Sequence, residues 1–281
     1  MKAVGVIPAR YASSRFPGKP LAALCGRPLV RHVYERARQS KTLARVVVAT
    51  DDLRIRDAVA AFGGEVQLTA AHHPSGTDRV AEVAASLSSE LIVNIQGDEP
   101  LIEPAMIDEA VAPFFVEANL VMGTVCRRLE AEDECHSPHV VKVVRDCRGF
   151  ALYFSRAPIP YHRAPSPKSK VQSPRSATAD QHQRTLPGSG QETLDVGHQT
   201  MYYKHIGLYV YRRDFLLELA RLAPTPLEET EQLEQLRALE YGYPIRVVET
   251  KYDSIGVDTP EDLARIERMV AATAWREAGD A

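Results

Sequence analysis

The sequence lacks the patterns that would place it in a membrane, crosslink it with disulfides or attract it to nucleic acid. None of its apolar runs reaches about 18 residues, the length that a membrane-spanning helix needs. Its four cysteines form no Cys-x-x-Cys pair and show no zinc-ligand spacing, so we expect reduced thiols in a cytoplasmic protein. With 34 basic and 37 acidic residues the formal net charge is −3, so we expect no nucleic-acid partner.

Sequence repeats are also absent, which excludes a solenoid or a propeller. At 281 residues with 44% hydrophobic side chains, the chain is long enough to bury a core. Short β-branched runs alternate with amphipathic segments, which predicts an α/β fold with a mostly parallel, doubly wound sheet. The expected strands lie near residues 4–7, 46–49, 65–69, 91–95, 121–127, 203–211 and 243–250. The expected helices begin near residues 28, 53, 75, 104, 215, 228 and 260, and the sixth of them runs to residue 239.

Two segments depart from this alternation. Residues 138–156 contain two short apolar runs with Gly149 between them, so we expect a β-hairpin that forms a small subdomain or a dimerisation arm. Residues 163–200 are rich in Pro, Gly, Ser and Gln and have almost no apolar periodicity, so we expect a flexible insertion, of which residues 166–198 are dispensable. We interpret the whole chain, residues 1–281, as one domain with these two additions.

A cationic loop follows the first expected strand. Arg10, Arg15 and Lys19 come directly after the apolar run that ends at Pro8. Ligands of open α/β sheets bind at the carboxyl ends of the strands, and Gly18 allows close approach of the backbone. The loop does not match a Walker A motif, and a solvated basic loop is the plain alternative. We interpret it as a binding site for a phosphate chain.

Two aspartates follow other strands. Asp98 lies just beyond a buried strand, and Asp258 comes directly before Thr259-Pro260. Carboxylate oxygens are the ligands that Mg²⁺ prefers. Asp258 is equally well explained as part of a helix start, and Asp51-Asp52 reads as a helix cap.

Seven segments together resemble a known family. They resemble the motifs of the sugar-activating nucleotidylyltransferases, and closely those of the 3-deoxy-manno-octulosonate (Kdo) cytidylyltransferases, in the same order, from residue 3 to about 270. The segments are Pro8–Pro20, His73–Arg79, Gln96–Pro100, Ala151–Ala157, His205–Tyr209, Leu233–Arg237 and Gly256–Asp262. The resemblance implies a nucleotide-diphospho-sugar transferase-like fold, a homodimer, and synthesis of CMP-Kdo and diphosphate from CTP and Kdo for lipopolysaccharide biosynthesis.

The same resemblance implies roles for particular residues. Nucleotide binding falls to Ala9, Arg10, Ser13, Arg15, Lys19, Ser75, Gly76 and Arg79. Arg10, Lys19 and Asp98 would be catalytic, with Mg²⁺ held by Asp98 and Asp258. Sugar binding falls to Gln96, Arg156, His205, Tyr209, Glu234 and Gln235, with Arg156 paired to the sugar carboxylate. Taken singly, Glu234 and Gln235 would be solvent-facing helix residues and His205 a core residue.

Two alternatives remain open at this point. A sister cytidylyltransferase for sialic acid or an amino-substituted Kdo would keep the phosphate loop and change the sugar pocket. A non-catalytic nucleotide-binding protein would keep the fold and lose an essential lysine or carboxylate. Lys19, Asp98 and Asp258 are all present, which favours an enzyme.

Overall fold

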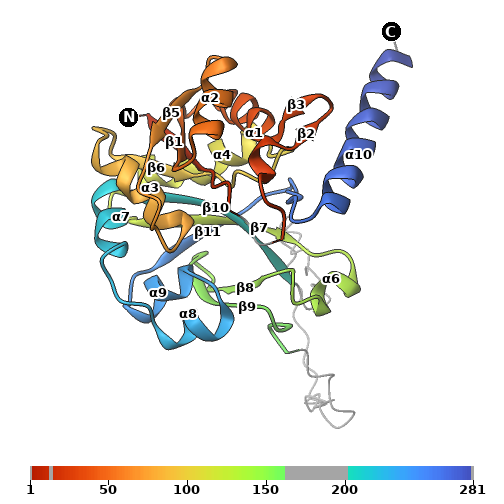
Figure 1. Cartoon of the computed structure of the whole chain (residues 1–281). Coiled ribbons are helices and arrows are strands. Elements are labelled where there is room, and N and C mark those ends of the chain that lie inside the picture. The colour runs from red at the N-terminus through yellow and green to blue at the C-terminus, as the bar shows by residue number, and fades with distance from the viewer. Residues whose placement is uncertain (1, 13–14, 162–201, 280–281) are drawn as a thin grey trace, which may run out of the picture.

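A mixed sheet forms the centre of the computed structural model, which describes residues 2–12, 15–161 and 202–279 (Figure 1). Ser13 and the expected insertion at 163–200 lie outside these residues. The strand order is β11-β7-β10-β6-β1-β4-β5, and along this path only β10 runs antiparallel to its neighbours. The prediction of a mostly parallel sheet is therefore confirmed. The strands are β1 (Ala3–Pro8), β4 (Leu43–Thr50), β5 (Glu65–Leu68), β6 (Leu91–Asn94), β7 (Met122–Arg128), β10 (Tyr203–Arg212) and β11 (Ile245–Glu249).

Helices cover both faces of the sheet, as a doubly wound fold requires. One face packs against α1 (Leu29–Ala37), α2 (Leu53–Ala61) and α4 (Pro104–Val111), and the other against α3 (Gly76–Ala85), α7 (Arg213–Leu219) and α9 (Gln235–Glu240). Their caps agree with the sequence: the side chain of Asp52 accepts from Arg54 N at the start of α2, and that of Ser75 accepts from Asp78 N at the start of α3. The short helices are η1 (Lys19–Leu21), α5 (Pro113–Val116) and α6 (Glu132–His136).

The helix predicted from residue 228 to 239 is wrong, because the structure has two helices there. Helix α8 (Pro226–Glu231) ends at Gln232, which has a left-handed φ of 54°, and α9 follows it. A capping box between Thr225 and Glu228 starts α8, and the Glu231 carboxylate bonds across to β9. Tertiary bonds therefore fix a turn that the apolar periodicity of the segment does not reveal.

The predicted hairpin is confirmed as β8 (Lys142–Arg145) and β9 (Ala151–Ser155), with Gly149 at a φ of 83° in the turn between them. It is continuous with the main sheet, because Lys142 of β8 pairs with Lys204 of β10. Strand β9 pairs with β8 alone among the described strands, so it forms an edge.

A third, smaller apolar cluster joins the last helix to the region of the cationic loop. Leu24, Leu29, Val257 and Ile266 are buried together there. They connect the hairpin of β2 (Ala23–Leu24) and β3 (Arg27–Pro28) to α10 (Pro260–Gly279), which extends away from the body (Figure 1). No helix within the described residues is long and apolar enough to cross a membrane. The cluster holds the start of α10, and with it Asp258, beside the cationic loop.

Substitution of Gly97 should destabilise the protein. A Cβ at this position would lie 2.7 Å from the backbone oxygen of Pro8 and 3.3 Å from Ile7 Cγ2. We expect Gly97→Ala to lower the free energy of unfolding by about 1–3 kcal/mol, the usual cost of overpacking, measured by urea denaturation. Gly256→Ala is the control, because no atom lies within 4 Å of its added Cβ. Equal denaturation midpoints for the two variants would contradict this tight approach.

Candidate active site

A cleft of about 890 Å³ opens at the carboxyl ends of the parallel strands, and a pocket of about 290 Å³ adjoins it. The cleft lies where β10 changes partner along its length: Tyr209 pairs with Asn94 of β6, whereas Lys204 pairs with β8. Between these points Gln96 Nε2 donates to the carbonyl of Gly207 at 2.9 Å. The sheet therefore separates at this place and leaves room for a ligand.

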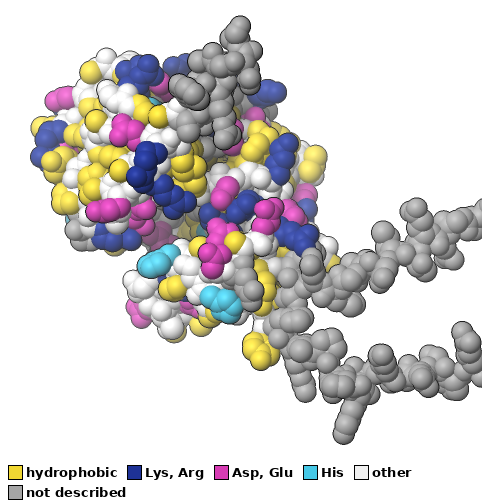
Figure 2. Space-filling view, turned by 90° about the vertical axis from the view of Figure 1, so that its right-hand side faces the viewer, with side chains coloured by type: hydrophobic (Ala, Val, Ile, Leu, Met, Phe, Trp, Pro, Cys, Tyr) yellow, Lys and Arg dark blue, Asp and Glu magenta, His cyan; other side chains and the backbone are white. Residues whose placement is uncertain are grey.

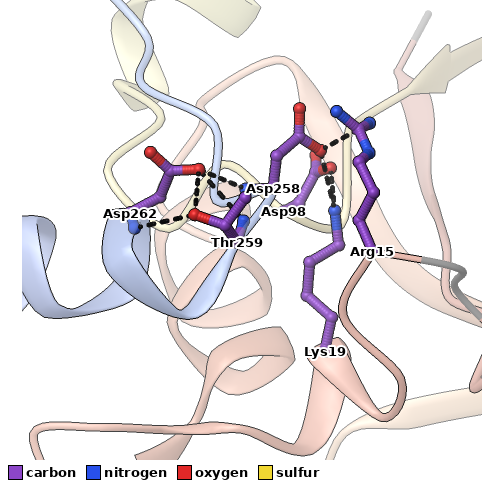
Figure 3. A network of polar contacts seen from close by, with 6 residues as sticks. All are labelled: Arg15, Lys19, Asp98, Asp258, Thr259 and Asp262. Carbon is purple, nitrogen blue, oxygen red and sulfur yellow. Dashed lines mark hydrogen bonds and ion pairs between the residues drawn. The ribbon is translucent and has the colours of Figure 1, made fainter.

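A cluster of opposite charges lies at the junction of the two cavities (Figure 3). Lys19 Nζ lies 2.6 Å from Asp98 Oδ2 and 3.4 Å from Asp258 Oδ1. Arg15 lies 3.1 Å from the same oxygen of Asp258. The Lys19 side chain is only 15% exposed, so solvent screens its ion pairs less than those of a surface lysine. The expectation that both aspartates face the cationic loop is confirmed.

The backbone around Asp258 is fixed by a helix cap. The Asp262 carboxylate accepts hydrogen bonds from Asp258 N at 3.1 Å, from Thr259 N at 3.0 Å and from Thr259 Oγ1 at 3.1 Å (Figure 3). Partial burial raises the pKa of Asp262, but these bonds outweigh it and the pKa lies below its usual value. Val257 N also donates to the carbonyl of Asp98 at 2.9 Å, which joins the two aspartate loops. Asp258 therefore both belongs to a helix start and faces the loop.

The two aspartates have the donor chemistry for magnesium. No group of three or more His, Cys, Asp or Glu side chains within the described ranges is arranged to hold a metal. Magnesium commonly takes one or two protein carboxylates and completes its shell with water and phosphate oxygens. Asp98 and Asp258 share one ammonium group, so a cation between their carboxylates is already compatible with the fold.

The predicted nucleotide-binding residues within the described part of the chain come together around the smaller pocket. Its lining includes Ala9, Arg10, Arg15, Lys19, Ser75, Gly76 and Arg79. Arg79 is buried, ion-paired to Asp51 at 3.2 Å and hydrogen-bonded to Thr69, so its charge is already compensated. Arg10 is exposed at the mouth of the pocket. Arg10, Arg15 and Lys19 are therefore the cations best placed for an anionic ligand.

Two predicted sugar-binding residues form an aromatic wall of the larger cleft. His205 Nε2 lies 3.1 Å from Thr124 Oγ1, and its ring packs edge-on against Phe154 and beside Tyr209. Burial lowers the pKa of His205 to about 3, so the imidazole is neutral at physiological pH. Burial also raises the pKa of Tyr209, so its hydroxyl stays protonated. Both side chains therefore offer uncharged hydrogen-bonding groups.

Glu234, Gln235 and Asn94 contribute a carboxylate and amides to the same cleft. Thr77 Oγ1 donates to Glu234 Oε2 at 2.6 Å, and the surrounding protein desolvates this carboxyl group and raises its pKa. Gln235 Nε2 is buried and has no hydrogen-bond partner among the described residues. Asn94 Oδ1 is also buried without a hydrogen-bond partner among the described residues, and Asn94 lines the same cleft. Buried unpaired amides are costly, and a polar ligand would satisfy them.

Sequence reasoning missed two cleft residues, Asn94 and Glu99. Asn94 is a polar residue at the end of an otherwise apolar buried strand, and this was the available signal. Glu99 lies next to Asp98 and accepts from Ser254 Oγ at 2.6 Å. Burial raises the pKa of Glu99 to about 7. Glu99 lies within the Gln96–Pro100 motif, but nothing in that motif predicts its desolvation.

The structure does not bring Arg156 into the cleft. Its guanidinium donates to the carbonyls of Glu231 at 2.8 Å, Pro138 at 3.1 Å and Gln232 at 3.3 Å. It is absent from the residues that line either cavity. The other predicted sugar-binding residues, Gln96, His205, Tyr209, Glu234 and Gln235, all line the larger cleft.

The fold and the charged cleft define the class of protein. A doubly wound sheet with a cationic loop and paired carboxylates at its carboxyl edge is the arrangement of an enzyme that handles nucleotide phosphates. On the face drawn in Figure 2, basic and acidic side chains lie side by side, without a broad patch of one sign. The charge is thus concentrated in local clusters such as the one around Lys19.

Comparison with known proteins identifies the family. The sequence matches the cytidylyltransferase family over residues 4–251. The 3-deoxy-manno-octulosonate cytidylyltransferase of Geobacter metallireducens is 53% identical over 95% of this chain and 96% of its own length. The enzyme of the same name from Syntrophotalea carbinolica is 54% identical over 95% of this chain and 98% of its own length. The chain therefore belongs to the cytidylyltransferase family, and within it to the 3-deoxy-manno-octulosonate cytidylyltransferases.

Solved structures agree with this assignment. A CMP:2-keto-3-deoxy-manno-octonic acid synthetase complexed with CTP superposes with a TM-score of 0.81 at 39% identity, over 97% of this chain and all of that one. The 4-diphosphocytidyl-2C-methyl-D-erythritol synthase of Anaerococcus prevotii superposes with a TM-score of 0.56 at 12% identity, over 96% of this chain and 99% of that one. The second likeness shows a shared fold alone.

The buried His205 should make the protein sensitive to acid. The unfolded chain binds a proton near the usual histidine pKa of 6.5, whereas the folded chain binds it only near 3. The unfolded state therefore holds more protons between these values, and the free energy of unfolding falls as the pH is lowered from about 6.5, by up to about 1.4 kcal/mol per pH unit from this group.

Urea denaturation at a series of pH values measures this effect. His205→Gln should flatten the profile below about pH 6.5, because glutamine does not titrate. His72→Gln, at an exposed histidine, serves as the control and should leave the profile unchanged. A His205→Gln profile as steep as that of the wild type would show that His205 is not held neutral by burial.

Proposed function

We propose that this protein transfers a cytidylyl group from CTP to Kdo, producing CMP-Kdo and diphosphate for lipopolysaccharide biosynthesis. The observation that carries the proposal is the cluster of Arg15, Lys19, Asp98 and Asp258, which lies where a pocket containing further cations meets a larger cleft. The names of the similar enzymes and the CTP complex of a similar structure support the choice of substrates. Retention of the lysine and both aspartates argues against a non-catalytic protein.

The reaction is an in-line displacement at the α-phosphorus of CTP. A hydroxyl oxygen of the sugar forms the new P–O bond while the bond to the diphosphate breaks, and the hydroxyl proton is released. Arg10, Arg15 and Lys19 bind and orient the triphosphate, because they are the cations at the pocket that can reach it. Lys19 also stabilises the negative charge that builds up on the departing diphosphate.

Asp98 and Asp258 are the residues that would hold Mg²⁺. When bound, the metal supplies positive charge that neutralises the phosphate oxygens during displacement. Lys19 bonds to both carboxylates, so the arriving triphosphate offers this ammonium an alternative anionic partner. Movement of Lys19 toward the phosphates would free both carboxylates for the metal.

The larger cleft would bind the acceptor sugar. The hydroxyl groups of the sugar would bind to side chains that all line this cleft and are mostly uncharged: Gln96, His205, Tyr209, Glu234 and Gln235. A hydroxyl group both donates and accepts, so it matches the unpaired amide of Gln235. The smaller pocket, with Ala9, Ser75 and Gly76, would surround the nucleoside.

We also propose that the chain works as a single nucleotidyltransferase domain, in the cytoplasm, as a homodimer. Among the described strands β9 pairs only with β8, and Leu152 on this strand is a large apolar side chain that is 62% exposed. Exposed apolar side chains beside a free strand edge favour association with a second chain. The absence of a disulfide-type cysteine pattern favours a reducing compartment.

The proposed activity predicts that diphosphate is released only when CTP and Kdo are both present. Release is followed with an enzyme-coupled diphosphate assay, with each nucleoside triphosphate in turn and with Kdo or sialic acid as the acceptor. We expect kcat/KM to be highest for CTP with Kdo, because the smaller pocket is proposed to bind CTP and the larger cleft is proposed to bind Kdo. Comparable use of sialic acid would contradict the assigned sugar, and release with CTP alone would contradict the transfer reaction.

Removing one carboxylate should abolish most of the activity without unfolding the protein. We expect Asp98→Asn to lower kcat by about 10²-fold or more and to weaken Mg²⁺ binding in a calorimetric titration, because a charge-stabilising group is lost. Asp57→Asn, at an exposed aspartate of α2, serves as the control and should retain the wild-type rate. Near-full activity of Asp98→Asn, or of protein treated with a chelator, would contradict the metal assignment.

A further inference from the structure

Tyr11, which follows Arg10 in the cationic loop, is covered by an arginine from helix α2. The guanidinium carbon of Arg54 lies 3.3 Å from the centroid of the Tyr11 ring. The Asp52 carboxylate binds this guanidinium with both oxygens: Arg54 Nε donates to Oδ1 at 3.0 Å and NH2 donates to Oδ2 at 2.6 Å. Because Asp52 also caps α2, the arginine is fixed at the start of the helix and stacks its planar group on the loop.

The Tyr11 ring also contacts the residue that precedes Lys19. A Cβ at Gly18 would lie 3.1 Å from Tyr11 Cε2 and Cζ and 3.2 Å from its hydroxyl oxygen, so the glycine backbone lies against the phenol end of the ring. Gly18 N donates to the carbonyl of Tyr11 at 2.9 Å. Gly18 has a left-handed φ of 73°, and η1 begins directly after it. Tyr11 therefore joins the two ends of the loop.

Two of the proposed phosphate-binding cations flank these contacts in the sequence. Arg10 directly precedes Tyr11, and Lys19 directly follows Gly18. Arg10 and Lys19 line the smaller pocket, whereas neither Tyr11 nor Arg54 is among the described residues that line this pocket or the larger cleft. Phosphate groups in the pocket would therefore meet Arg10 and Lys19, and the stack of Arg54 on Tyr11 would act on these two cations through the backbone.

The second half of the loop has an anchor of its own. Phe16 packs against the small apolar cluster that contains Val257 and Ile266. Lys19 N donates to the carbonyl of Phe16 at 3.2 Å. Phe16 thus connects the loop to the region of α10, and Tyr11 is the side chain through which α2 contacts the beginning of the loop.

We propose that Arg54 is a positioning residue for the triphosphate: by stacking on Tyr11 it holds the cationic loop in the shape that places Arg10 and Lys19 beside the phosphate chain. The inference deepens the proposed function and rests on it for the identity of the ligand. Arg54 acts without touching the nucleotide, because its charge is paired with Asp52 and its planar face is stacked on the loop.

A double-mutant cycle separates positioning from direct phosphate binding. The affinities for CTP and for inorganic tripolyphosphate are measured by calorimetry in Arg54→Ala, Tyr11→Leu and the double variant. We expect Arg54→Ala to weaken both ligands by about 3- to 5-fold, the size that a cation–π contact at a partly exposed site supports, and to leave KM for Kdo unchanged. In the Tyr11→Leu background the same substitution should have little further effect. An Arg54→Ala effect of equal size in both backgrounds would overturn the proposal, because Arg54 would then act on the phosphates directly.

Two matched variants control for the charge and for the ring. Arg56→Ala removes an arginine of the same helix that is also ion-paired to an aspartate, Asp57, and it should bind both ligands as the wild type does. Tyr11→Phe keeps the aromatic face and should also match the wild type. A loss in Arg56→Ala as large as that in Arg54→Ala would indicate a general charge effect, and a loss in Tyr11→Phe as large as that in Tyr11→Leu would show that the hydroxyl matters; either result would contradict stacking.

Hydrogen exchange tests the loop without any ligand. The Gly18 amide donates to the carbonyl of Tyr11, so it should exchange faster in Arg54→Ala and Tyr11→Leu than in the wild type or in Arg56→Ala. Unchanged exchange would overturn the positioning role even if CTP binding weakens. This measurement stands if the proposed function fails, because it needs neither CTP nor Kdo.

Discussion

The ion pairs of Lys19 with Asp98 and Asp258 connect three distant parts of the chain. The lysine follows β1, the first aspartate follows β6, and the second begins α10. Two carboxylates this close to one ammonium group would repel each other without it, because like charges at short range are unfavourable. The Asp262 cap and the small apolar cluster around Ile266 act on the same arrangement, since both fix the start of α10. The proposed site of the reaction therefore lies where three segments far apart in the sequence come together.

The second constraint is the partner change along β10. Because β10 pairs with β6 at one end and with β8 at the other, the sheet itself provides the floor of the cleft. Residues 139–141 and the α8–α9 turn line the cleft beside this floor. An acceptor that is recognised by several hydroxyl contacts requires these segments at a fixed spacing, because each contact depends on it.

Strand positions and most helices could be predicted from the sequence, because a two-residue period, caps and turn glycines are local properties. Most residues that the sequence predicted for the site also line the two cavities. Lys19, Asp98 and Asp258 were expected together because parallel strands end at one edge of a sheet. The break at Gln232 could not be predicted, because bonds to β9 impose it. The hydrogen bonds of Arg156 to backbone carbonyls could not be predicted either, because no sequence pattern indicates the partners of a guanidinium group. The burial of Asn94 and the raised pKa of Glu99 are likewise properties of the assembled fold.

A double-mutant cycle on the free energy of unfolding tests most directly whether Lys19 holds the two aspartates together. Lys19→Met, Asp98→Asn and the double variant are compared with the wild type by urea denaturation without nucleotide. The account predicts that Lys19→Met alone is destabilised, because two carboxylates are left without their shared cation, and that adding Asp98→Asn restores part of the loss. Strictly additive losses, with the double variant the least stable of the four, would contradict the central place given to this interaction.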